Sequence, residues 1–121
     1  MGTCDVKADT VTNRVYVTLR GFSSDQEMKG HLERVATEVR KLKPGFVMIS
    51  DISQMKSATP GGTAMLQDIM VLYRKHGIAK IIRIVGDDVI AKGQFNRVAK
   101  DAGVPVDYVK SLADAEKLAG G

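Results

Sequence analysis

Three aspartates follow apolar segments in this chain of 121 residues. Asp51 comes directly after segment 46–50, and Asp87 and Asp88 follow segment 80–86. If both segments are strands of a parallel sheet, the aspartates meet at its carboxyl edge, where ligands usually bind. Carboxylates are ligands for Mg²⁺, so one hypothesis is a Mg²⁺-dependent phosphoacceptor site. The alternative, which we favour, is structural: Asp88 caps a helix and Asp51 bonds to its own loop.

A run of hydroxyl residues and a glycine-led helix start follow Asp51, in the stretch DISQMKSATPGGTAML (51–66). The residues expected to bind a partner or ligand are Asp51, Ser53, Ser57, Thr59, Gly61, Gly62 and Thr63. Phosphate near a helix N-terminus meets free amides and a favourable dipole, so Ser57, Thr59 and Thr63 are the candidate phosphorylation sites. A small anion is the second hypothesis. We favour a packing role for the two glycines, because no lysine has the spacing of a P-loop.

The other residues capable of catalysis are isolated from one another. His31 and His76 fall in different predicted helices, and no serine or cysteine lies in a nucleophile motif such as G-x-S-x-G. The single Cys4 cannot form an internal disulfide, and there is no Cys/His cluster for zinc. We therefore expect no catalytic residues, no metal, no cofactor and no enzymatic activity.

The charge pattern argues against a nucleic-acid-binding protein. The net charge is +4, but the 18 basic residues are interleaved with 14 acidic ones. Three Tyr, three Phe and no Trp give no stacking platform for single strands. No apolar run approaches the length of about eighteen residues that a membrane span needs, and the first residues lack the apolar core of a signal peptide. We expect a single cytoplasmic domain over residues 1–121.

The hydrophobic periodicity predicts the element order β-β-α-β-α-β-α-β-α. Alternating residues over 4–8 and 15–19 indicate a hairpin, and a helix capped by Ser23 or Ser24 runs to Leu42. The remaining predicted elements are strands at 46–50, 80–86 and 104–109 and helices from Pro60 to before Gly77, from about Asp88 to Gly103, and from Ser111 to Leu118. Alternating strands and helices require right-handed crossovers and a largely parallel sheet, with the hairpin at one side. The fold class is an α/β sandwich.

This order, with FVMISDIS (46–53) leading into a glycine-containing helix start, resembles the STAS family, the fold of sulfate transporters and anti-sigma factor antagonists. The chain looks most like the SpoIIAA-like branch, and its closing SLADAEKLAG (111–120) is similar to the ending of that family. The resemblance implies a STAS-like sandwich with a mixed, mostly parallel sheet. It also implies a bacterial signalling protein that acts by protein-protein interaction.

Antagonists of this family carry an Asp-Ser-Ser-Gly loop in which a partner kinase phosphorylates a serine. Counted from Asp51 without gaps, that motif falls on residues 59–62, and Gly61 occupies the acceptor position. The resemblance implies an interaction module without the usual phosphoacceptor, contacting its partner through 51–66 and the second helix. The expected partner is a kinase-like anti-sigma factor, or a second copy of the chain in a homodimer.

The alternative function is binding of a small anionic or lipid-like ligand at the glycine-led helix start. Met55, Met65 and Met70 lie near that start in sequence; we expect them to belong to an adaptable core, and the alternative is a lining that adapts to an apolar ligand or partner. Val71 points away from the buried stripe of the second helix. With Ile52 and Met55 it is expected to form an apolar patch for a partner or a second copy.

Overall fold

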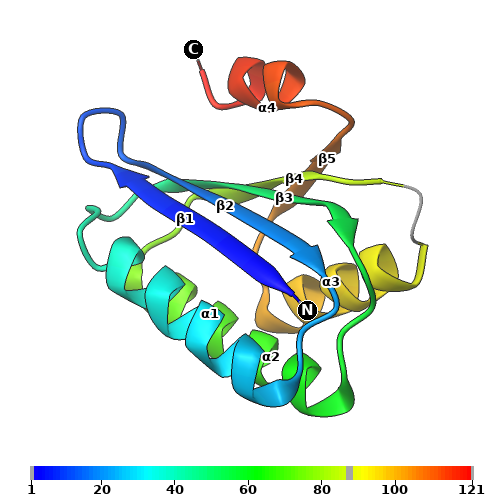
Figure 1. The fold of residues 1–121 in the computed structure, drawn as a ribbon. Coiled ribbons are helices and arrows are strands. Elements are labelled where there is room, and N and C mark those ends of the chain that lie inside the picture. The colour runs from blue at the N-terminus through cyan, green and yellow to red at the C-terminus, as the bar shows by residue number, and fades with distance from the viewer. Residues whose placement is uncertain (1, 87–88, 121) are drawn as a thin grey trace.

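A five-stranded sheet with helices on both faces organises the chain (Figure 1). The structure is a computed structural model that describes residues 2–86 and 89–120. Its elements are β1 (Thr3–Asp9), β2 (Arg14–Gly21), α1 (Asp25–Val39), β3 (Val47–Met55), α2 (Pro60–His76), β4 (Lys80–Ile84), α3 (Val89–Ala102), β5 (Val106–Val109) and α4 (Leu112–Leu118). The order agrees with the prediction, and the α/β sandwich is confirmed.

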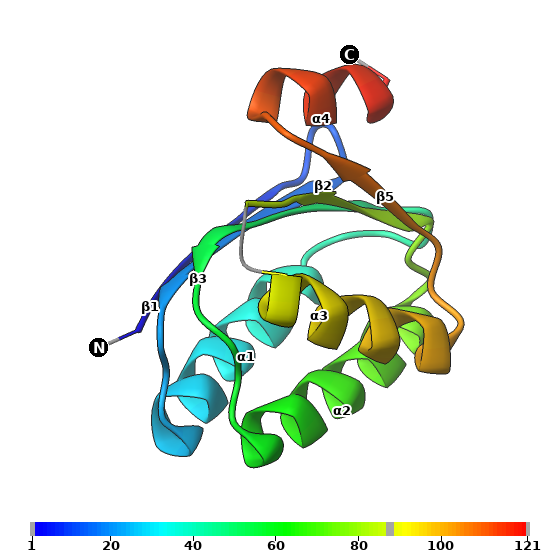
Figure 2. The same cartoon turned by 90° about the vertical axis from the view of Figure 1, so that its right-hand side faces the viewer.

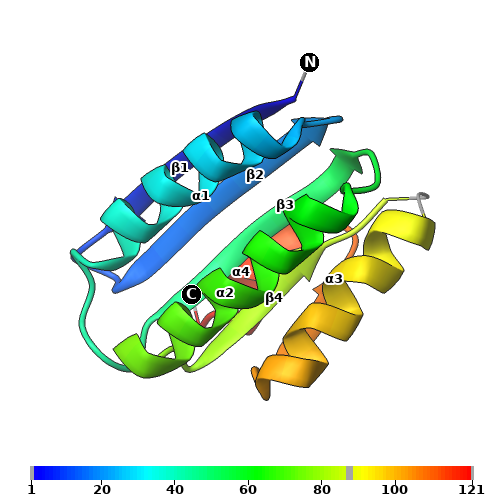
Figure 3. The same cartoon turned by 90° about the horizontal axis from the view of Figure 1, so that it is seen from below.

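The strands lie in the spatial order β1-β2-β3-β4-β5. β1 is antiparallel to β2, and every other neighbouring pair is parallel, as the predicted hairpin and crossovers require. Helices α1, α2 and α3 cover one face of the sheet, and α4 lies over the other (Figure 2). Seen from below, α2 lies between α1 and α3 (Figure 3). The layered arrangement therefore buries the central strands on both sides.

The larger of two apolar clusters fills the space between the sheet and helices α1 to α3. The smaller one lies on the opposite face, where Ala115 of α4 packs with Ile49, Ile82 and Ile84. Successive residues of β4 therefore enter different clusters, since side chains of a strand alternate between faces. Ile81 belongs to the larger cluster and Ile82 to the smaller.

Local signals set the starts of α1 and α2 and the end of α2 as predicted, whereas α1 ends at Val39 and not at Leu42. Ser24 and Glu27 form a capping box at the start of α1. Thr59 caps α2, Pro60 occupies its first turn, and Gly77 ends it in the left-handed conformation at φ 93°. None of the helices within residues 2–86 and 89–120 has both the length and the apolar character needed to cross a membrane.

The third strand is longer than the sequence predicted. It runs from Val47 to Met55 rather than over 46–50, so Asp51 and Ser53 lie inside a strand and the connecting loop is only 56–59. The reason is a nonlocal partner: β2 continues alongside it, with Thr18 opposite Asp51. After this pair the register between β2 and β3 shifts, because β3 contains one extra residue there.

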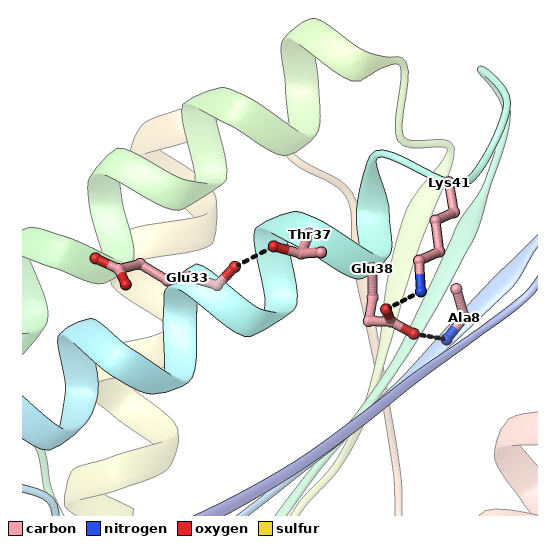
Figure 4. A network of polar contacts seen from close by, with 5 residues as sticks. All are labelled: Ala8, Glu33, Thr37, Glu38 and Lys41. Carbon is pink, nitrogen blue, oxygen red and sulfur yellow. Dashed lines mark hydrogen bonds and ion pairs between the residues drawn. The ribbon is translucent and has the colours of Figure 1, made fainter.

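One edge strand of the sheet, β1, is hydrogen-bonded to α1 (Figure 4). The backbone N–H of Ala8 donates to Glu38 Oε1 at 3.1 Å. Lys41 Nζ forms an ion pair with the other carboxylate oxygen of Glu38, and these two bonds lower the pKa of Glu38. An edge N–H that would otherwise be open to another strand is thereby satisfied within the chain.

Candidate functional site

Loop 56–59 is anchored by hydrogen bonds to α3 and to the end of β2. Gln94 of α3 uses its whole amide group: Oε1 accepts from the Ala58 N–H at 2.8 Å, and Nε2 donates to the Ala58 carbonyl at 3.0 Å. At the other end of the loop, the Lys56 N–H donates to the Gly21 carbonyl at 3.0 Å. These bonds fix the backbone of a segment that connects a strand to a helix.

The start of α2 uses the hydroxyl groups that the sequence singled out. Thr59 Oγ1 accepts from the Gly62 N–H at 2.9 Å, which is the N-cap bond. The same hydroxyl donates to the carboxylate of Asp25, in the first turn of α1. Thr63 Oγ1 donates to the Thr59 carbonyl at 3.0 Å. The hydroxyls of Thr59 and Thr63 thus both have structural roles.

Gly61 lies directly against Asp25. A Cβ atom built on Gly61 would lie 2.3 Å from Asp25 Oδ2, so a side chain there requires Asp25 to move. The packing role expected for Gly61 agrees with this contact. The carboxylate also brings a negative charge to the N-terminus of α2, where the helix dipole favours anions. Phosphorylation of Thr59 would remove the hydroxyl proton that Thr59 donates to Asp25 and would place a phosphate beside this carboxylate, which disfavours modification there.

The remaining residues of the predicted site divide between strand and loop. Asp51 Oδ1 accepts from the Ser53 N–H at 2.9 Å and from Ser53 Oγ at 2.7 Å, a local bond of the structural kind expected. Asp51 pairs with Ile84, so it lies on the α4 face of the sheet. Ser57 is half-buried in the loop, and Gly62 is buried in the first turn of α2.

The proposed magnesium site rests mainly on residues that the structure leaves out. Asp87 and Asp88 lie outside the described residues, so their relation to Asp51 stays a prediction. Within the described part of the chain, no group of three or more His, Cys, Asp or Glu side chains is placed to hold a metal ion.

The predicted apolar patch of Val71, Ile52 and Met55 is wrong, because two of these three residues are buried. Val71 is 47% exposed, as predicted, but Ile52 and Met55 are each only 3% exposed and belong to the larger core cluster. They are buried because β3 continues through both residues. The half-buried Met65 and Leu72 instead line a groove between α1 and α2.

Arg83 is a site residue that the sequence reasoning missed. It lies on β4 between Ser50 of β3 and Tyr108 of β5, and its side chain is among the largest that are fully buried. Burial lowers the pKa of Arg83 to about 10, so the guanidinium stays charged at neutral pH. The signal was present in KIIRIVG (80–86), where one charged residue interrupts a strand predicted to be covered on both faces.

The two histidines have separate structural roles. His31 is buried, with Nε2 3.1 Å from Ser23 Oγ and Nδ1 3.2 Å from an Arg34 nitrogen. Because Arg34 is a donor only, Nδ1 accepts and Nε2 carries the proton. Burial, followed by the Arg34 charge, lowers the pKa of His31. His76 Nε2 donates to the Leu42 carbonyl at 2.7 Å, tying α2 to the chain before β3.

Comparisons with known proteins support the fold. No family model matches the chain, and no curated protein matches it. Among solved structures, the chain is similar to an uncharacterized protein of the DUF3478 family with a SpoIIAA-like fold, from Shewanella loihica PV-4. The TM-score is 0.68 with 11% identity, over 97% of this chain and 92% of that one. The SpoIIAA-like fold expected from the resemblance is confirmed, and at this identity the likeness concerns the fold alone.

Proposed function

We propose that this chain is a non-enzymatic regulatory module of the STAS-like type, which binds a protein partner through loop 56–59 and the exposed side of α2. The observation that carries the proposal is the anchoring of this loop by Gln94 from α3 and by Asp25 from α1. A surface that is ordered before binding loses less conformational entropy when a partner docks, so more of the contact energy appears as affinity.

The shape of the surface around α2 suits such contacts. Helix α2 lies between α1 and α3, and a groove of about 260 Å³ runs beside it on the α1 side. A second hollow of about 460 Å³ on the α3 side includes Val71 and Arg74 in its lining. Exposed Val71 therefore lines the hollow on the α3 side, while Met65 and Leu72 line the groove on the α1 side.

The surface differs from that of a phosphorylation-switched antagonist at the acceptor position, residue 61. Gly61 provides no hydroxyl, and the Asp25 carboxylate lies against it. The negative charge that phosphorylation would add at this helix start is thus present permanently, on a neighbouring helix. We infer that partner binding does not depend on a phosphate at residue 61, and Ser57 and Thr63 remain the candidates for any other modification.

The proposal is tested by isolating the tagged chain from its own cells and comparing two matched variants. Val71→Asp places a charge on the exposed side of α2, and Val11→Asp makes the same change at a 93% exposed position in the β1–β2 turn. A protein recovered in stoichiometric amount with the wild type and Val11→Asp, and lost with Val71→Asp, supports the proposal. Equal recovery with all three chains, or no such protein with the wild type, contradicts it.

A further inference from the structure

Arg83 carries a charge into the core without an acidic partner among the described residues. Its side chain is 1% exposed, and its Nε and Nη2 atoms have no hydrogen-bond partner there. The ring of Phe95 lies 4.6 Å from the guanidinium carbon, which stabilises the cation but supplies no lone-pair acceptor for the N–H groups. A buried charge that lacks hydrogen bonds is costly, so an anion at this position would be bound strongly.

The two unpartnered nitrogens belong to one edge of the guanidinium group. Their N–H bonds point in the same direction, and their spacing matches the two oxygens of a carboxylate. Arg83 lines a small cavity of about 20 Å³ between the sheet and α1 to α3. That volume is about what a single water molecule needs. Ser50 and Tyr73 are the other polar side chains in its lining, and the rest is apolar.

The cavity and the groove between α1 and α2 share two lining side chains. Leu32 of α1 and Ile69 of α2 line both the cavity and the groove between these helices. The groove has a volume of about 260 Å³, and Met65 and Leu72 contribute to its largely apolar lining. A ligand that spans both spaces must displace Leu32 and Ile69, which requires other staggered conformations of these two side chains. The two spaces together would have a cationic end inside and an apolar channel leading out.

We propose that Arg83 binds the carboxylate group of an apolar, chain-like ligand through its Nε and Nη2 atoms, with the chain lying between α1 and α2. Bidentate pairing gives each of the two unpartnered nitrogens an acceptor and neutralises the buried charge. A small free carboxylate offers Arg83 the same chemistry without the chain. This ligand site goes beyond the proposed function, because it requires no protein partner and uses interior residues.

The test follows the Arg83 side chain itself. In protein labelled with nitrogen-15, the Arg83 Nε–H signal is assigned by its disappearance in Arg83→Met, a variant that keeps an apolar side chain of similar length. The full chain is then titrated with decanoate, with acetate, and with 1-decanol as the uncharged control of the same chain length. Calorimetry on the wild type and on Arg83→Met gives the affinities.

The expected result is that decanoate shifts the Nε–H signal and that 1-decanol does not. Arg83→Met should weaken decanoate binding about 10-fold to 100-fold, since hydrogen bonds to a charged group are lost. A shift with acetate at equal affinity would also support the carboxylate site and identify a small free acid as the ligand. An unchanged signal with both carboxylates, or equal decanoate affinity in Arg83→Met, would overturn the proposal and assign the edge of Arg83 to an internal water.

Discussion

The guanidinium carbon of Arg83 lies 4.6 Å from the centroid of the Phe95 ring. This contact joins the middle of β4 to α3 across the core. It places a positive charge against an aromatic face at a depth where most neighbours are apolar. The stability of the fold and the proposed ligand site therefore depend on the same side chain.

Replacing Arg83 by Met should stabilise the protein when no ligand is bound. The variant removes a buried charge whose Nε and Nη2 are unpartnered among the described residues, and it keeps the packing against Phe95. Exchanging buried charges for apolar residues of similar volume is often stabilising, here by on the order of 1 kcal/mol or more. Urea denaturation of chains refolded without ligand measures the change. A lower midpoint than that of the wild type would mean that the guanidinium has an internal partner.

Glycine is required at residue 86 and not at residue 30. A Cβ atom on Gly86 would lie 2.3 Å from the Ser53 carbonyl oxygen, and backbone cannot easily move away. Gly86→Ala should therefore cost about 1–3 kcal/mol of unfolding free energy. Gly30 is exposed in α1 with nothing within 4 Å of the added atom, so Gly30→Ala should gain about 0.5–1 kcal/mol. Thermal unfolding of the two variants measures both changes in unfolding free energy. Equal effects of the two substitutions would refute the close approach of β3 to residue 86.

The effect of a serine at residue 61 on the unfolding free energy should depend on Asp25. Gly61→Ser places a side chain where the Asp25 carboxylate lies, so it should destabilise the wild-type chain. In an Asp25→Ala background the same serine has room, and its cost should fall by about 0.5–3 kcal/mol, the range for contacting residues. A double-mutant cycle by urea denaturation measures the difference. Strictly additive effects would show that Asp25 does not occupy this space.

The stability of the protein should fall as the pH drops below about 6.5, the ordinary pKa of histidine. The pKa of His31 is lowered in the folded state, mainly by burial. Between the folded and unfolded pKa values the unfolded chain binds more protons, so unfolding free energy rises with pH and is lost on acidification. His31→Gln should flatten this part of the profile between pH 5 and pH 7. A profile that is unchanged by the substitution would exclude His31 as its cause.

Local signals made the starts of α1 and α2 and the end of α2 predictable from the sequence, but not the end of α1, which lies at Val39 and not at Leu42. Ser24, Pro60 and Gly77 act on their own turns, and each occupies the expected position. The end of β3 was mispredicted, because polar letters after Ser50 suggested a loop while pairing with β2 extends the strand to Met55.

The candidate site was predictable only in part, because its anchors come from distant segments. Asp25 reaches Thr59 across 34 positions, and Gln94 reaches Ala58 across 36. Neither residue belongs to a motif, and each acts through a packing arrangement of three helices that no local pattern encodes. Thr59 was among the residues predicted for the site, but its bond to Asp25 was not predicted.

Site-specific photo-crosslinking in the native cells tests the central claim most directly, namely that loop 56–59 and α2 form the contact surface. A photoreactive amino acid is placed at Gln67, exposed on α2, and separately at Val11, exposed in the β1–β2 turn as a control. The account predicts a crosslink to one protein, or to a second copy of this chain, from residue 67 and none from residue 11. Crosslinks of equal yield from both positions, or none from residue 67, would contradict it.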